Sequence, residues 1–283
     1  MNAKPVIGCH VSIRGGYRDA ARAARETGAG GFQYFPKNPR SLEPKAFDAR
    51  DAHACAEYCK EHGLVSIAHT PYPTNLAAAG VGADSRARHA ASLRNDLEIA
   101  EACGSIGIVV HFGSVKETDP VGSYREMIEC LNEVLDGWSG RTLLLIENLA
   151  GNRGPAGTTL EELVTIRRLA RRPECIGFCF DTCHAFASGL WKPETTGDLL
   201  RHGSELGYWP EVKAVHLNDS RYGYASHRDR HARTGEGHIG LEALLALLKT
   251  DELIGVPAIL ETDKGPDGTH REEIGRLLDR LKG

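Results

Sequence analysis

The sequence predicts a closed (β/α)8 barrel that spans residues 1–283 as one domain. Three observations support this prediction: short β-type runs alternate with longer helical patterns, the alternation occurs eight times, and the β-type runs are almost wholly apolar. The run at 142–148 (TLLLIEN) has the composition of a strand in a parallel sheet that is buried on both faces. The length also suits one barrel, since this fold commonly takes about 250 residues.

The predicted strands are runs rich in Val, Ile, Leu and Phe, bounded by Gly, Pro or polar residues. They lie at 6–12, 29–35, 65–70, 106–112, 142–148, 176–182, 212–217 and 256–262. The predicted helices follow amphipathic patterns, and some begin at a capping residue such as Thr159. They lie at 16–27, 46–62, 84–103, 122–137, 159–171, 196–206, 240–249 and 269–282. A doubly wound open sheet is the alternative, but it needs no eighth repeat and binds ligands at one crevice rather than around a ring.

Composition and charge exclude some classes of protein. A net charge of −4 argues against a protein that coats polyanions without specificity. No window approaches the roughly 18 apolar residues of a membrane span, and no apolar core follows a basic N-terminal segment, so we expect a soluble cytoplasmic protein, and a monomer. The eight cysteines lack paired CxxC spacing, and we expect buried free thiols.

Six of the eight predicted strands end in a residue that can bind a metal ion. These residues are His69, His111, Glu147, Asp181, His216 and Glu261. The carboxyl ends of barrel strands converge on one face, so we expect these side chains to meet around one pocket. Asp and Glu are seldom buried without a partner, so the pattern indicates a polynuclear metal site. The first three residues could hold one metal ion, and the last three could hold a second with Glu147 as a bridge.

A third set of ligands is indicated nearby. Asp229 and His231 are two residues apart, so their side chains point to one side of an extended loop, and His184 lies three residues beyond Asp181. Nine ligands would then bind three ions. Zinc suits imidazole and carboxylate ligands, although manganese or iron could occupy some positions. We expect His10, at the end of the first strand, to support the site by hydrogen bonding rather than to bind a metal.

This ligand set suits phosphodiester hydrolysis. Clustered metal ions lower the pKa of bound water and stabilise both the attacking and the leaving oxygen. The positive charge of three divalent ions exceeds the negative charge of four carboxylate ligands, so the pocket should attract a phosphate. Cations in the loops on the same face could contact the phosphates of DNA. They are Lys37, Arg40, Lys45, Arg153, Arg221, Arg228, Arg230, Arg233 and Lys264.

At these residues the sequence resembles the endonuclease IV (deoxyribonuclease IV) family of zinc-dependent abasic-site endonucleases. The similar segments run from end to end of the chain: GCHVS (8–12), IAHTPYPTNL (67–76), HFGS (111–114), IENLAG (146–151), FDTCHAFASG (180–189), VHLNDS (215–220), DRHARTGEGHIG (229–240) and ILET (259–262). The sequence departs from the family pattern at HFGS, where HPGS is common, and at Ser41 and Pro73, which stand in DNA-binding loops. None of the nine metal ligands is lost.

The resemblance implies a (β/α)8 barrel that cuts double-stranded DNA on the 5′ side of abasic sites, leaving 3′-hydroxyl and 5′-deoxyribose phosphate ends, and that also trims 3′ ends. It implies three zinc ions, held by His69, His111 and Glu147, by Glu147, Asp181, His216 and Glu261, and by His184, Asp229 and His231. Glu147 and Glu261 are then the catalytic carboxylates. Arg40 would enter the minor groove, and Tyr72 would pack where the DNA is opened.

Two other functions remain open from the sequence. In a sugar isomerase or epimerase, the set of Glu147, Asp181, His216 and Glu261 would hold a single metal ion against a hydroxy-ketone, which leaves the remaining histidines without a role. In a DNA-binding barrel without activity, the metals would be structural. Structural zinc sites are normally closed by protein ligands, whereas His69, His111 and Glu147 leave one position open.

Overall fold

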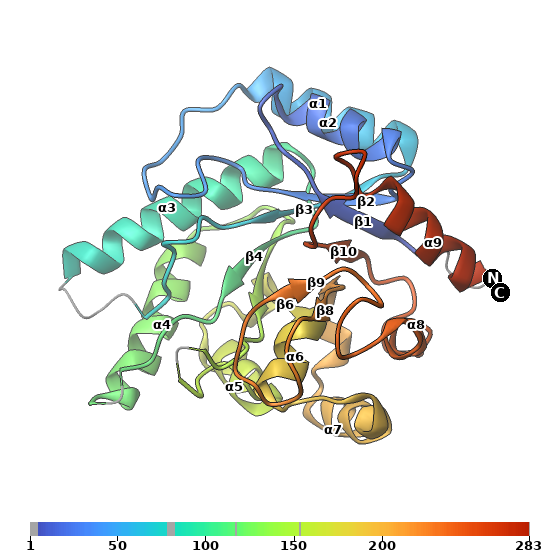
Figure 1. Ribbon diagram of the computed structural model, residues 1–283. Helices are drawn as coiled ribbons and strands as arrows, with labels where there is room; N and C mark the ends of the chain where they lie inside the picture. Colours follow the sequence, from blue (N-terminus) through green and yellow to red (C-terminus); the bar gives the residue numbers. More distant parts are fainter. Residues whose placement is uncertain (1–4, 78–82, 117, 153, 283) are drawn as a thin grey trace.

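In the computed structural model, which describes residues 5–77, 83–116, 118–152 and 154–282, eight parallel strands close into a barrel (Figure 1). Around the barrel the order is β1, β10, β7, β6, β5, β4, β3 and β2. The strands are β1 (Ile7–His10), β2 (Gly31–Tyr34), β3 (Val65–His69), β4 (Gly107–His111), β5 (Leu143–Glu147), β6 (Ile176–Asp181), β7 (Val212–His216) and β10 (Ala258–Leu260). The predicted (β/α)8 barrel is therefore confirmed, and each strand lies within its predicted range.

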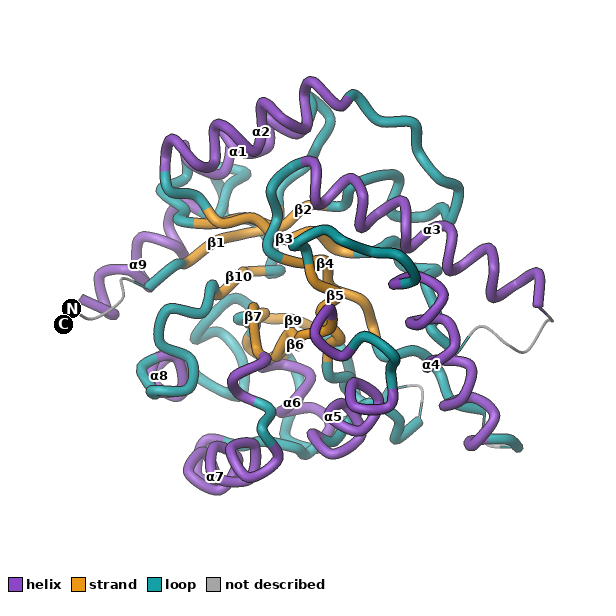
Figure 2. Tube along the Cα trace, turned by 180° about the vertical axis from the view of Figure 1, so that it is seen from behind, coloured by secondary structure: helices purple, strands orange, loops and turns teal. Residues whose placement is uncertain are grey.

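Helices surround the strands, as the view from behind shows (Figure 2). They are α1 (Tyr17–Glu26), α2 (Ala49–His62), α3 (Ala83–Ala102), α4 (Pro120–Leu135), α5 (Leu160–Leu169), α7 (Thr196–Leu206), α8 (Leu241–Leu248) and α9 (Arg271–Lys282). Their ends differ from the predicted ends by three residues at most. Helix α2, for example, begins at Ala49 because the Asp48 carboxylate caps it by accepting hydrogen bonds from the backbone amides of Arg50 and Asp51.

The barrel interior is filled by side chains. Its central layer consists of Ile67, Val109, Leu145, Cys179, Ala214 and Ile259. Each of these residues is at most 1% exposed, so the interior is a packed core that leaves only the two ends of the barrel for function. Gly8 keeps β1 close to its neighbour, since a Cβ there would collide with the carbonyl oxygen of Gly31.

The short elements that were not predicted include one helix and two strands. Helix α6 (Thr182–Ser188) begins directly after β6, with Asp181 as its N-cap. Within the predicted loop at 218–239, β8 (Asp219–Ser220) and β9 (His231–Ala232) form an antiparallel pair next to α6 (Figure 1). The buried Asp219 carboxylate organises this loop, because it accepts hydrogen bonds from backbone amides that include those of Gly235 and Ile239.

The cysteines agree with the prediction from the sequence. All eight are buried free thiols. In the described parts of the chain, the helices lack the combination of length and apolar composition that a membrane span needs.

Candidate metal centre

The first predicted set of ligands comes together at the carboxyl ends of three neighbouring strands. His69 ends β3, His111 ends β4 and Glu147 ends β5. The Oε2 atom of Glu147 lies 3.2 Å from Nε2 of His111 and 3.8 Å from Nε2 of His69. Nδ1 of His69 is 2.8 Å from the carbonyl oxygen of Thr70, so Nδ1–H donates there and Nε2 is directed into the site.

The second predicted set lies next to the first. One donor atom from each of Glu147, Asp181, His216 and Glu261 falls within 4.8 Å of the others. Nδ1 of His216 is 2.7 Å from Oε1 of Glu147, 3.2 Å from Oε2 of Glu261 and 3.8 Å from Oδ2 of Asp181. Glu147 therefore presents one carboxylate oxygen to each set, which is the geometry of a bridging ligand.

The third predicted set also lies beside Asp181, whose Oδ2 atom is 3.8 Å from both His216 and His231. Oδ1 of Asp229 is 3.3 Å from Nε2 of His184 and 3.4 Å from Nε2 of His231. Asp181 also approaches these histidines, since one donor atom from each of the three residues lies within 4.8 Å of the others. The structure thus brings all nine predicted donors to one end of the barrel, and it adds Asp181 to the neighbourhood of the third set.

Unpartnered buried atoms show that this site suits cations. Oε2 of Glu147, Nε2 of His184 and Nε2 of His231 are buried and make no hydrogen bond with any described residue. Buried polar atoms are normally paired, because leaving one unpaired costs on the order of 1–3 kcal/mol. Each of these atoms points at a potential metal-binding atom of another residue. Imidazole and carboxylate groups are the ligands of zinc and similar divalent ions. The residues present therefore fit metal ions in all three sets.

The electrostatics of the site lead to the same conclusion. Burial opposes the ionisation of Glu147, but the adjacent His216, His111 and His69 hold the pKa of its carboxyl well below the usual value. For Glu261, burial is likewise outweighed by His216, and the pKa is about 2. Burial also opposes a charge on His216, but the neighbouring acidic groups raise its pKa well above the usual value. The carboxylates thus require positive charge beside them, either as protons on the histidines or as metal ions.

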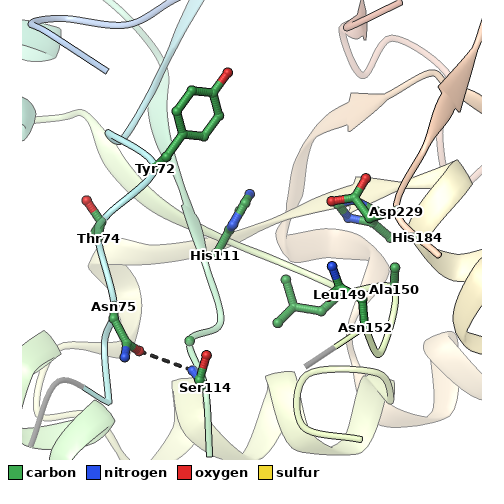
Figure 3. Close-up of a pocket in the computed structure, with 11 residues that line it drawn as sticks. Tyr72, Thr74, Asn75, His111, Ser114, Leu149, Ala150, Asn152, His184 and Asp229 are labelled. Atoms are coloured by element: carbon green, nitrogen blue, oxygen red, sulfur yellow. Dashed lines mark hydrogen bonds and ion pairs between the residues drawn. The ribbon is translucent and has the colours of Figure 1, made fainter. Parts of the chain in front are cut away.

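A hollow of about 630 Å³ opens above the metal centre, lined by residues that include Phe35, Tyr72, Glu261 and Lys264. An adjoining pocket shares some of this lining: Figure 3 shows His184 and Asp229 on one side of it, with His111 and Tyr72 across from them. The hollow is the place where a substrate could reach the donor atoms. His10 also lines the hollow but belongs to none of the three sets among the described residues.

Tyr72 and Arg40 lie on one rim of this hollow. Tyr72 is 62% exposed, and its ring packs against Phe35 at 5.1 Å between centroids. The backbone amide of Tyr72 donates a hydrogen bond of 2.9 Å to the carbonyl oxygen of Pro39, the residue before Arg40. The exposed Arg40 is therefore held close to Tyr72, although the two residues come from loops after different strands.

Some of the loop cations do not have the predicted role. Lys37 is only 4% exposed, and its ammonium group lies 3.0 Å from Oδ1 of Asp96, so the prediction that it contacts DNA is wrong. The guanidinium of Arg233 is directed at Glu272 and Glu273, where it anchors the loop to α9. Exposed cations in these loops include Arg40, Arg228 and Arg230. Arg153 lies outside the described residues.

Sequence analysis missed two amides that touch the donors. Nδ2 of Asn218 donates to Oδ2 of Asp181 at 2.8 Å and to Oε2 of Glu261 at 3.3 Å. Gln33 contacts His216 and Glu261 from β2. Their positions in the sequence could have identified them. Asn218 follows His216 by two residues, and Gln33 is a polar residue in an otherwise apolar strand.

The fold and the donor sets define a class: a TIM barrel with candidate metal sites at the carboxyl ends of its strands. The xylose isomerase-like TIM barrel family matches residues 21–282, and the chain belongs to it. A curated protein of Symbiobacterium thermophilum named "Probable endonuclease 4" is 42% identical over 277 residues, which cover 98% of this chain and 99% of that protein. A protein of the same name from Bifidobacterium longum is 34% identical over 278 residues, which cover 96% of each chain.

Solved structures agree with these relatives. The crystal structure of endonuclease IV from Thermus thermophilus superposes with a TM-score of 0.85 at 32% identity, covering 98% of this chain and 99% of that one. The chain therefore belongs to the endonuclease IV family, and it is a nuclease of the hydrolase class. A D-tagatose 3-epimerase-like protein superposes with a TM-score of 0.70 at 20% identity over 98% of each chain, which shows a shared fold alone.

Proposed function

We propose that this chain hydrolyses the phosphodiester bond on the 5′ side of abasic sites in double-stranded DNA, leaving 3′-hydroxyl and 5′-deoxyribose phosphate ends. The proposed cofactor is three zinc ions, with manganese or iron as possible replacements at some positions. The observation that carries the proposal is Glu147, whose two carboxylate oxygens face two different donor sets. Names of the relatives support the nuclease activity, since both curated proteins are called probable endonucleases.

The proposed ligands are divided among three ions. His69, His111 and Glu147 would hold the first, Glu147, Asp181, His216 and Glu261 the second, and His184, Asp229 and His231 the third. When bound, such ions supply positive charge for the phosphate, a water molecule of lowered pKa, and stabilisation of the departing oxygen. All nine donors come from one chain, which is consistent with activity as a monomer.

Glu147 and Glu261 are the proposed catalytic carboxylates. Glu261 lines the hollow, and its pKa of about 2 keeps it ionised throughout the physiological range. Its Oε1 atom accepts a hydrogen bond of 2.6 Å from Gln33, so the carboxylate is held in one orientation. In that orientation its other oxygen faces the second set and can accept a hydrogen bond from an attacking water. Glu147 is fixed in turn by His216, at 2.7 Å.

Arg40 and Tyr72 are the proposed DNA-binding residues. Their shared rim places a cation and an exposed aromatic ring next to the hollow, where Arg40 can enter the minor groove and Tyr72 can occupy the space opened in the duplex. An abasic nucleotide has no base to unstack or unpair, so extruding it toward the metal centre costs less than flipping an intact nucleotide. Abasic sites would then be selected because the DNA deforms more easily there than at an intact nucleotide.

We also propose that the same centre removes blocking groups from 3′ ends, because the scissile bond there is again a phosphodiester.

A single-metal sugar isomerase is the alternative with the same fold. It would explain the set of Glu147, Asp181, His216 and Glu261, but it gives no role to the convergence of His184, Asp229 and His231. The Nε2 atoms of His184 and His231 are buried and make no hydrogen bond with a described residue, so a further metal ion would give them a partner. This observation favours the endonuclease.

The proposal is tested with a duplex that carries one tetrahydrofuran abasic analogue and a 5′ label on the damaged strand. With zinc present, we expect a single cut on the 5′ side of the analogue, a product that a polymerase can extend, and an uncut control duplex without the analogue. An intact damaged strand would falsify the proposed function.

A further inference from the structure

Gln33 touches the metal centre although no ligand comes from its strand. It is the third residue of β2 and is fully buried. Its Nε2 atom donates a hydrogen bond of 2.6 Å to Oε1 of Glu261, and its Oε1 atom lies 2.8 Å from Nε2 of His216. The side chain thus joins two proposed ligands of the second set, from β7 and from the end of β10.

The hydrogen bonds of Gln33 fix the orientation of its amide and place a hydrogen on Nε2 of His216. An ionised carboxylate can only accept hydrogen bonds, so the amide nitrogen of Gln33 must face Glu261 and its oxygen must face His216. That oxygen is also only an acceptor, so Nε2 of His216 must carry a hydrogen. Nδ1 of His216 lies 2.7 Å from Glu147 and 3.2 Å from Glu261, so it can carry a second hydrogen in the metal-free chain. When a metal ion takes the place of that hydrogen, Nε2 keeps its own and Nδ1 is the nitrogen left to bind the ion.

His216 differs in this respect from the other proposed histidine ligands. Nδ1 of His69 and of His184 lies 2.8 and 2.9 Å from a backbone carbonyl oxygen, which leaves Nε2 as the donor atom in both. His111 and His231 also turn Nε2 toward a carboxylate of the centre. The centre therefore combines one Nδ1 donor, from His216, with four Nε2 donors.

We propose that Gln33 is a positioning residue that fixes the tautomer of His216 and the orientation of the Glu261 carboxylate, and so sets the metal affinity of the second set. The inference rests on the proposed function, in which that set holds a metal ion. Residues that orient a metal ligand typically change metal affinity or activity by about 10- to 100-fold when they are replaced.

The test compares two variants of the full chain after loading with zinc. Gln33→Met keeps the length of the side chain and removes its hydrogen bonds. Tyr34→Phe is the matched control: it lies next along β2, points to the opposite face of the strand, and loses one buried hydrogen bond of 2.9 Å to Ser105. The measurement is the zinc retained at increasing concentrations of a chelator.

We expect Gln33→Met to release one ion at roughly 10- to 100-fold lower chelator concentration than the wild type, and Tyr34→Phe to behave like the wild type. Equal retention by Gln33→Met and the wild type would overturn the inference and leave the proposed function standing. A wild-type chain that binds no zinc would instead overturn the proposed function itself.

A second measurement does not depend on the folding of any variant. Nitrogen NMR of the zinc-loaded wild type, labelled with ¹⁵N only at histidine, distinguishes metal-bound from protonated ring nitrogens. We expect one ligand histidine with metal on Nδ1 and hydrogen on Nε2, and four with the reverse assignment. Five ligands of the same tautomer would contradict the inference.

Discussion

Nζ of Lys37 lies 3.0 Å from Oδ1 of Asp96, and both side chains are almost completely excluded from water. The pair joins the loop after β2, which carries Arg40, to helix α3. The same ammonium group donates to the carbonyl oxygen and the hydroxyl of Ser92, each at 2.8 Å. The loop that presents Arg40 is therefore attached to the barrel by a buried charge.

Replacing Lys37 by Met should destabilise the fold strongly, because it leaves Asp96 buried without a partner. We expect the free energy of unfolding at pH 8 to fall by about 3–5 kcal/mol, measured by urea denaturation. The double variant Lys37→Met with Asp96→Leu removes both charges and should recover most of this loss. Unchanged stability of the single variant would show that the pair contributes nothing.

Asp96 should also make stability depend on pH. Burial raises the pKa of its carboxyl to about 7 although Lys37 opposes the shift, whereas the usual value is 3.8. Because the folded pKa is the higher one, the contribution of Asp96 to stability is complete below about pH 4 and is lost as the pH rises through about 7. Between pH 5 and 7 the wild type should lose roughly 1 kcal/mol per pH unit relative to Asp96→Asn. Parallel stability curves for the two proteins would contradict this.

Glu261→Gln should separate binding from cleavage. The amide keeps the shape of the side chain but removes a carboxylate from the second donor set, so we expect abasic DNA to bind normally and to be cut about 100-fold more slowly, or slower still, in single-turnover assays. Normal turnover would remove Glu261 from the catalytic groups.

Arg40→Ala should weaken DNA binding more than chemistry. Loss of one cation at the rim should raise the Kd and lower the slope of log Kd against log salt by about one, with little change in cleavage at saturating DNA. Arg125→Ala, an exposed arginine on α4 outside the barrel, serves as the control and should change neither quantity. A purely catalytic defect in Arg40→Ala would argue against its place in the groove.

The barrel and the nine donors could be predicted because both leave strong signals in the sequence. A strand buried on both faces must be apolar along its length, so a His, Asp or Glu at its end is conspicuous. Barrel topology then brings those ends together, and in the structure His69 and Glu261 line the same hollow.

Other features could not be predicted, because their meaning depends on distant partners. Lys37 resembles a solvated loop lysine until α3 places Asp96 beside it. Gln33 carries no charge and matches no ligand pattern, yet it orients two donors from other strands. The hairpin of β8 and β9 depends on Asp219, whose carboxylate accepts hydrogen bonds from backbone amides that lie 16 and 20 residues further along the chain.

The central claim is that the donors form three metal sites at one end of the barrel, and elemental analysis of the purified full chain tests it most directly. After dialysis against zinc and removal of loosely bound ions, we expect about three divalent ions per chain, one for each donor set. About one ion per chain would contradict the account and would favour the single-metal isomerase.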